Sequence, residues 1–182
     1  RFRPALRQVM PPIRPTPSDH LKRSSYGGSM WLSRSRFELR EEVPAAPDDV
    51  RTFYTDLANM KLVHPLVVAV DCLADRQDAQ GRCREYRVRD RISLGPFRMG
   101  VTYRATVLIA PDGVVHTEAR QFPRVRLLGT VTFARAGAGT TVTEAVHIEA
   151  PRPLIAFTAA QAEKAHAAML AAIRHHFESG ST

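Results

Sequence analysis

The sequence has no long hydrophobic run, little cysteine and almost no lysine. No stretch of about 18 consecutive apolar residues occurs among the 182 residues, so we expect no membrane-spanning helix and no integral membrane contact. The apolar core of a signal peptide is also missing, and we expect a cytoplasmic protein. The two cysteines, Cys72 and Cys83, could face each other across a hairpin, but reduced thiols are expected in that compartment.

Several motifs of catalytic and cofactor chemistry are absent as well. There is no Ser-His-Asp order, no glycine-rich phosphate loop and no spacing of cysteine and histidine that suits a metal ion. The segment Gly137-Ala-Gly139 indicates a hairpin turn, because no strand-to-helix transition follows it. We therefore expect no metal and no cofactor, and these absences argue against hydrolases, kinases and metalloenzymes.

Positive charge is abundant but concentrated at one end. The formal net charge is +8, and residues 1–36 hold eight lysines and arginines against one acid, so the rest of the chain carries only +1. A basic tail on a nearly neutral domain does not form the groove that a phosphate backbone requires, so we expect no nucleic-acid partner. The first 29 residues contain five prolines and no apolar period. We predict a disordered tail over residues 1–33 and one domain over residues 34–179.

The apolar pattern after the tail changes period several times. Residues 37–43 alternate like a strand, and Pro47 then opens a short amphipathic helix with apolar residues at i, i+3, i+4 and i+7 from Val50. A second brief helix, residues 59–64, ends before Pro65. Short connections between the strands that follow predict an antiparallel meander with one apolar and one charged face. Those six strands, with a period of two, are predicted at residues 66–73, 83–92, 99–109, 114–121, 125–134 and 141–149.

A long alanine-rich helix is predicted for residues 157–178. The segment Thr158-Ala-Ala-Gln161 fits a capping box at its start, although Pro153 allows an earlier start. At about 1.5 Å per residue the helix would be roughly 33 Å long, enough to lie across the whole sheet. The small alanine side chains would leave a hollow between the helix and a curved sheet, and such hollows bind apolar molecules. One side of the helix carries Ala162, His166, Met169, Ile173 and Phe177 at spacings of three and four.

The order of these elements resembles the helix-grip fold of the START-like superfamily, which includes the polyketide cyclase/dehydrase and lipid-transport families and the proteins similar to birch pollen allergen. Local sequences agree at residues 37–50, at Phe53-Tyr-Thr-Asp-Leu57 with His64-Pro65, and at Gly139-Thr-Thr-Val-Thr-Glu144. The resemblance covers about residues 34–178. It implies an α+β fold in which a seven-stranded curved antiparallel sheet wraps around the long C-terminal helix, with two short helices after the first strand.

The resemblance also implies an elongated apolar cavity between sheet and helix. Our leading hypothesis is that the protein binds or carries a hydrophobic small-molecule ligand there, either a lipid or a polyketide-like molecule. By strand and helix parity, several polar side chains face this space, and His64 would lie at its entrance. The candidate ligand-binding residues are Tyr86, Val88, Asp90, Met99, Val101, Tyr103, Thr117, Leu127, Val131, Glu144, His166, Met169, Leu170, Ile173 and His64.

The polar candidates leave alternatives open. A carboxyl of Asp90 or Glu144 inside the cavity would have a raised pKa and suggest proton chemistry or ligand orientation, but either residue could instead pair with an arginine. His166 could act as a general acid or base, or simply be hydrogen-bonded beneath the sheet. The alternative function is a polyketide aromatase or cyclase with His166, Tyr103 and Asp90 as catalytic candidates. A third hypothesis is an interaction protein whose interior is filled by its own side chains. The oligomeric state does not follow from the sequence.

Overall fold

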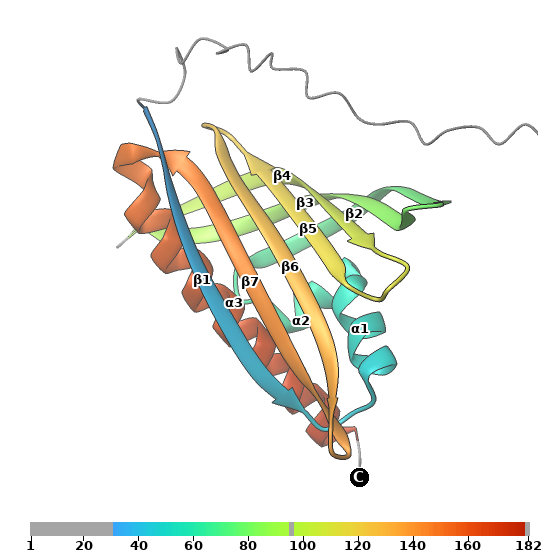
Figure 1. Cartoon of the computed structure of the whole chain (residues 1–182). Helices are drawn as coiled ribbons and strands as arrows, with labels where there is room; N and C mark the ends of the chain where they lie inside the picture. The colour runs from blue at the N-terminus through green and yellow to red at the C-terminus, as the bar shows by residue number, and fades with distance from the viewer. Residues whose placement is uncertain (1–30, 95–96, 181–182) are drawn as a thin grey trace, which may run out of the picture.

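The computed structural model describes residues 31–94 and 97–180, in which one curved sheet lies around one long helix (Figure 1). The predicted tail lies outside these residues up to residue 30, and the first strand begins at Leu32. Within the described ranges the strands are β1 (Leu32–Val43), β2 (Val67–Asp78), β3 (Gly81–Leu94), β4 (Phe97–Ile109), β5 (Val115–Gln121), β6 (Val125–Ala136) and β7 (Gly139–Pro151). The helical segments are α1 (Pro47–Thr55), η2 (Leu57–Asn59), α2 (Met60–Val63) and α3 (Arg152–Ser179).

The strands form a seven-stranded antiparallel sheet in the order β1-β7-β6-β5-β4-β3-β2. From β2 to β7 each strand pairs with the next along the chain, which is the predicted meander. β1 lies at the far edge and pairs with β7, with Leu39 opposite Glu144. The sheet, the two short helices after β1 and the long last helix confirm the predicted fold.

The period of two in the sequence gives the sheet its two faces. On β3 the side chains of Tyr86, Val88 and Asp90 are buried, whereas Arg87 and Arg89 are exposed. Successive side chains of a strand point to opposite faces, so the first three lie on the concave face. Most of β7 alternates in the same way between buried and less buried residues. The concave face is therefore apolar apart from a few acids and hydroxyls, and it is the face that α3 covers.

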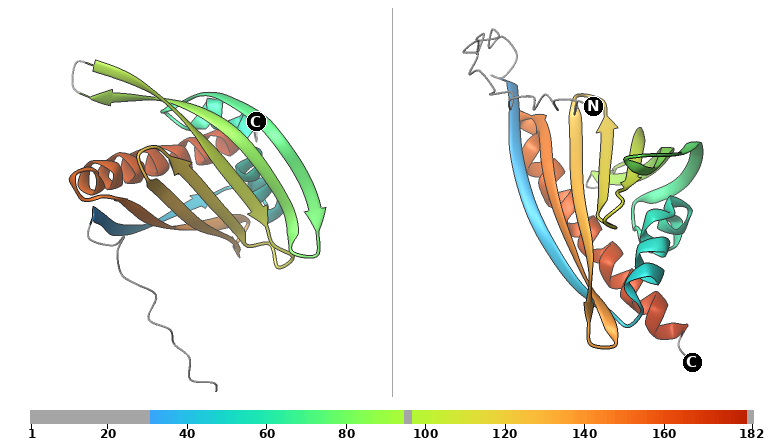
Figure 2. Two further views of the ribbon diagram at one scale, coloured as in Figure 1. Left: turned by 90° about the horizontal axis from the view of Figure 1, so that it is seen from above. Right: turned by 45° about the vertical axis from the view of Figure 1, so that its right-hand side comes forward.

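Helix α3 lies inside the curve of the sheet, with β1 and β7 on one side and β2–β4 on the other (Figure 2). Its start differs from the prediction, because the helix begins at Arg152, with Pro153 in its first turn, and Thr158 lies inside it. The backbone N–H groups of a helix's first turn have no partner within the helix, so a proline, which lacks this N–H group, fits there. The helix accordingly begins at the proline signal and not at the capping box. The buried residues of α3 are Ala162, Ala165, Met169, Leu170 and Ile173. None of the described helices has the length and apolarity needed to cross a membrane.

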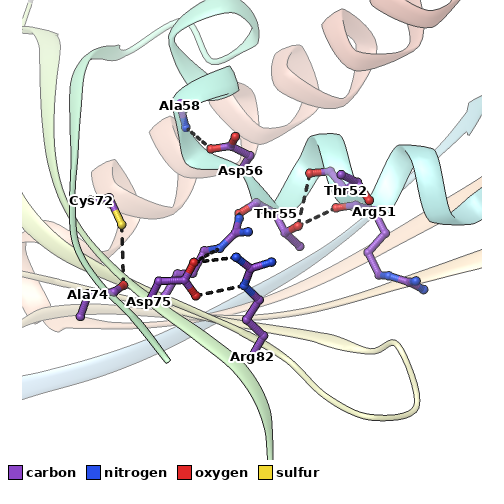
Figure 3. A network of polar contacts seen from close by, with 10 residues as sticks. Arg51, Thr52, Thr55, Asp56, Ala58, Cys72, Ala74, Asp75 and Arg82 are labelled. Atoms are coloured by element: carbon purple, nitrogen blue, oxygen red, sulfur yellow. Dashed lines mark hydrogen bonds and ion pairs between the residues drawn. The ribbon is translucent and has the colours of Figure 1, made fainter. Parts of the chain in front are cut away.

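A polar network ties α1 to the β2–β3 hairpin (Figure 3). The carboxylate of Asp75 accepts hydrogen bonds from Nε and Nη2 of Arg82, at 3.0 and 2.7 Å. Arg84 lies 3.3 Å from the same carboxylate and also donates to the backbone oxygen of Thr55, at the end of α1. These contacts hold the hairpin against α1.

The two cysteines do not form a disulfide. Cys72 lies opposite Tyr86, and Cys83 lies opposite Arg76, so the register of β2 and β3 separates them. The Sγ atom of Cys72 lies 3.7 Å from the backbone oxygen of Ala74, which it contacts as a weak donor (Figure 3).

Candidate functional site

A cavity of about 620 Å³ lies between the concave face of the sheet and the first half of α3. Strands β2–β7 and all the helical segments contribute to its lining, which is mainly apolar. Ala162 and Ala165 of α3 face the cavity, and their small side chains leave it open. One end opens near the β5–β6 turn and the start of α3, where the lining side chains Phe122 and Phe157 are 90% and 38% exposed.

The structure places ten of the predicted ligand-binding residues on the cavity wall and five elsewhere. The five, Tyr86, Val131, Glu144, Leu170 and Ile173, are almost fully buried in the core beside the cavity. They do not line it because α1 and the second half of α3 fill that end of the curved sheet with side chains. The ten on the wall are His64, Val88, Asp90, Met99, Val101, Tyr103, Thr117, Leu127, His166 and Met169.

Glu144 lies behind the cavity wall and forms hydrogen bonds with two side chains from other elements. It projects from β7, is fully buried, and its Oε1 accepts a hydrogen bond from the Tyr54 hydroxyl of α1 at 2.7 Å. The same oxygen lies 2.9 Å from Nδ1 of His166 on α3. Burial alone would raise the pKa of Glu144, but the charge and hydrogen bond of His166, with the Tyr54 hydroxyl, hold it below its usual value.

His166 forms an ion pair with Glu144. Burial acts to lower the pKa of the imidazole, but the charge and hydrogen bond of Glu144 outweigh burial and raise it. We therefore assign an imidazolium with Nδ1–H donating to the carboxylate. The side chain remains 21% exposed, and His166 is part of the lining, so this exposed part faces the cavity.

His64 lies beside His166 at the cavity wall. It is the residue that ends α2, and its Nδ1 accepts a hydrogen bond from the backbone N–H of Leu66 at 3.4 Å. The two imidazole rings meet edge to face, with centroids 5.9 Å apart. Burial and the charge of His166 lower the pKa of His64 to about 4. His64 is therefore neutral at neutral pH.

Asp90 and Tyr103 form a second polar group on the wall, contributed by the neighbouring strands β3 and β4. Asp90 is only 9% exposed. Its burial raises its pKa to about 6, although a hydrogen bond from Tyr103 and the charge of His166 act in the opposite direction. Burial and the charge of Asp90 raise the pKa of Tyr103 well above its ordinary value. Oδ1 of Asp90 has no hydrogen-bond partner among the described residues.

Sequence reasoning missed part of the site. Tyr54 was predicted only as an apolar position of α1, yet it lines the cavity and holds Glu144. The opening was missed because Phe122 lies in a turn, where no period indicates which way a side chain points. Within residues 31–94 and 97–180, no group of three or more histidine, cysteine, aspartate or glutamate side chains could hold a metal ion. Four residues of α3 that precede Ala162, where the predicted inward-facing residues begin, also line the cavity and were not predicted. They are Leu154, Phe157, Thr158 and Gln161.

Comparisons with known proteins bear on this arrangement. Residues 34–178 match the sequence profile of the family described as polyketide cyclase / dehydrase and lipid transport. No curated protein matches the sequence.

Solved structures with the same fold include the Zhui aromatase/cyclase from Streptomyces sp. R1128, at 16% identity and a TM-score of 0.68, over 82% of this chain and 97% of that one. TTHA0849 from Thermus thermophilus is 18% identical with a TM-score of 0.65, over 81% of this chain and all of that one. The di-domain ARO/CYC BexL from the BE-7585A biosynthetic pathway is 18% identical with a TM-score of 0.64, over 80% of this chain and 50% of that one. At these identities the likeness establishes a shared fold and nothing more.

Proposed function

Because the chain belongs to the polyketide cyclase / dehydrase and lipid transport family, we propose that it binds or carries an apolar small molecule, a lipid or a polyketide-like compound, between the sheet and α3. The cavity is the observation that supports this proposal. Its volume of about 620 Å³ lies within the range of about 300–1,000 Å³ found for small-molecule sites. Its wall is mainly apolar with a few polar groups, which is the composition that such sites share.

The structure suggests a test that fills the cavity from α3. Ala165 faces the cavity and is 4% exposed, whereas Ala168, one turn along the same helix, is exposed. We expect Ala165→Leu to weaken binding of a lipophilic fluorescent dye at least tenfold, because the added carbons occupy the ligand's space. The matched Ala168→Leu variant adds the same carbons outside the cavity and is expected to bind like the wild type.

The same preparation identifies the ligand. Organic extraction of the purified protein, followed by mass spectrometry, is expected to yield a hydrophobic molecule that is depleted in Ala165→Leu. If the wild-type protein yields no such molecule and binds no lipophilic dye, the proposed function is wrong.

A second candidate function is an aromatase or cyclase. The polar side chains on the cavity wall favour it, namely His166 and the pair of Asp90 and Tyr103. Ring closure by aldol addition needs a base to take a proton from the carbon beside a carbonyl and an acid to protonate the carbonyl that is attacked. Water then leaves, and no oxidant or reductant is needed. Asp90, with a pKa of about 6, is suited to accept the proton near neutral pH, and the His166 imidazolium is suited to donate one.

Turnover separates the two candidates. We expect a cyclase to convert a synthetic poly-β-ketone thioester, and Asp90→Asn to lower its kcat by about 10²–10⁴-fold while the chain still binds. Asp71→Asn, which makes the same substitution at an exposed position of β2 outside the cavity, is the matched control and should leave kcat within a few fold. A wild-type protein that binds the chain but closes no ring faster than buffer does would contradict the enzymatic candidate.

A further inference from the structure

Two histidine side chains from different elements meet on the wall of the cavity. His64 follows α2, His166 belongs to α3, and both are among the residues that line the cavity. Their ring centroids are 5.9 Å apart with the planes at 82°. Their joint position is a consequence of the fold, because α3 packs against α2.

The hydrogen bonds already made by the two rings determine which nitrogen of each is free. Nδ1 of His166 is 2.9 Å from Oε1 of Glu144, an acceptor, so this nitrogen carries a hydrogen. Nδ1 of His64 accepts from the backbone N–H of Leu66, so this nitrogen presents a lone pair. A neutral imidazole with a lone pair on Nδ1 carries its hydrogen on Nε2.

Both rings therefore present an Nε2–H group. His166 has a raised pKa through its carboxylate partner and carries hydrogens on both nitrogens, whereas His64, with its lowered pKa, stays neutral and keeps its one hydrogen on Nε2. Among the described residues, no side-chain acceptor is found for either Nε2–H. Two donors without acceptors on an otherwise apolar wall leave hydrogen-bonding capacity for a ligand.

We infer that the imidazoles of His166 and His64 bind one electron-rich oxygen of the ligand, and that this oxygen belongs to a neutral carbonyl group on an otherwise apolar molecule. The inference rests on the proposed function and specifies the ligand class for it. A carboxylate fits less well, because the carboxylates of Asp90 and Glu144 already interact with the one imidazolium. The Tyr54 and Tyr103 hydroxyls lie with these two acids and donate to them, and Phe37 contacts the His166 ring edge to face at 5.8 Å.

Matched probe compounds test the inference. 2-Acetylnaphthalene carries a carbonyl oxygen where 2-isopropylnaphthalene carries a methyl group, and the two have nearly the same shape. We define the ketone preference as the dissociation constant of 2-isopropylnaphthalene divided by that of 2-acetylnaphthalene. We expect this preference to be roughly tenfold or more higher in the wild type than in His166→Phe, as for a hydrogen bond from a charged donor. Comparing ratios removes the difference in hydrophobicity between the probes. 2-Naphthoate is expected to bind more weakly than the ketone.

Further variants separate a hydrogen bond from a change in the fold. His64→Phe leaves the pair of His166 and Glu144 intact, and we expect it to reduce the ketone preference about threefold to tenfold. His147→Phe makes the same substitution at an exposed position of β7 outside the cavity and should leave the preference unchanged. In the wild type, infrared spectroscopy should show the carbonyl stretch of bound 2-acetylnaphthalene at a lower frequency than in hexane, and His166→Phe should reverse that shift.

The outcomes distinguish this inference from the proposed function. Suppose that the ketone preference is no greater in the wild type than in either histidine variant, and that the carbonyl stretch of the bound ketone matches that in hexane. The inferred two-imidazole site is then wrong, whereas the apolar cavity is unaffected. Tighter binding of 2-naphthoate than of the ketone would overturn the assignment to a neutral carbonyl. If neither naphthalene nor any lipophilic dye binds, the proposed function itself falls.

Discussion

Asp90 is an acid whose buried position on the cavity wall opposes its ionisation. Burial on the cavity wall raises its pKa from an ordinary value of 3.8 to about 6. Because the folded value lies above the unfolded one, the folded state holds the proton more tightly, and the protonated side chain favours folding. This contribution is complete below about pH 4 and is lost as the pH rises through 6. An acid kept at this cost in an apolar wall is a candidate for contact with a ligand.

The substitution Asp90→Asn is expected to remove this pH dependence. Each pKa unit corresponds to about 1.4 kcal/mol, so the free energy of unfolding of the wild type should fall relative to the variant by on the order of 3 kcal/mol between pH 4 and pH 7. Urea unfolding at several pH values measures this difference. Asp71→Asn changes an exposed carboxylate on β2 and is the matched control. Parallel pH profiles of wild type and Asp90→Asn would contradict the assigned burial effect.

Single residues were predictable from the sequence where one period governed them. The alternation of β3 and β4 placed Val88, Asp90 and Tyr103 on the concave face, and the stripe of the last helix placed His166 there. The hydrogen bond between Tyr54 and Glu144 could not be predicted, because 90 positions separate the two residues and no local pattern relates them. The packing of α1 decides which inward residues line the cavity and which fill the core. No local pattern in the sequence indicates that packing.

The hairpins depend on backbone conformations that only some residues adopt. Gly81 begins β3 at a φ of +124°, and a Cβ atom there would collide with the backbone oxygen of Ile109 in β4. Gly137, in the β6–β7 turn, has a φ of +57°, and a Cβ there would meet no atom within 4 Å. The β6–β7 turn was predicted from Gly137 and Gly139. The start of α3 was predicted less well, because Pro153 and Thr158 both gave plausible start signals.

The two glycines therefore offer a matched comparison. We expect Gly81→Ala to lower the free energy of unfolding by about 3 kcal/mol or more, because the left-handed conformation and the collision with β4 both act against it. Gly137→Ala should cost only about 1–2 kcal/mol, because it meets the conformational penalty alone. Chemical denaturation of the two variants measures the difference. Equal costs would show that the β2–β3 hairpin shifts to accommodate the added carbon.

The sheet and α3 together enclose a space that protein atoms leave unfilled. A cavity of this size forgoes packing contacts that the interior would otherwise make. A ligand that occupies it restores those contacts and binds only the folded state, so ligand binding and folding are linked. The existence of a hollow followed from the alanines and the resemblance. Its volume and opening did not, because they depend on how far α1 and the β5–β6 turn reach across the sheet.

Ligand binding is expected to stabilise the delipidated protein. At a free concentration about one hundred times its Kd, 2-acetylnaphthalene should add about 2.7 kcal/mol to the free energy of unfolding and raise Tm by roughly 5–10 °C. Scanning calorimetry at increasing ligand concentration measures the shift. Ala165→Leu should show little increase under the same conditions. A Tm that does not depend on ligand concentration in the wild type would contradict binding to the folded state.

The strand order governs when the protein can fold. β1 is made before the other strands but pairs with β7, about one hundred residues further along the chain, and α3 follows β7. Strands β2 to β7 can form hairpins one after another as they are synthesised, whereas β1 must wait for the last of them. Pairing over such a sequence distance is slow. On the ribosome the concave face therefore stays open to water until α3 emerges, and we expect a nascent chain stalled before Arg152 to be prone to aggregation.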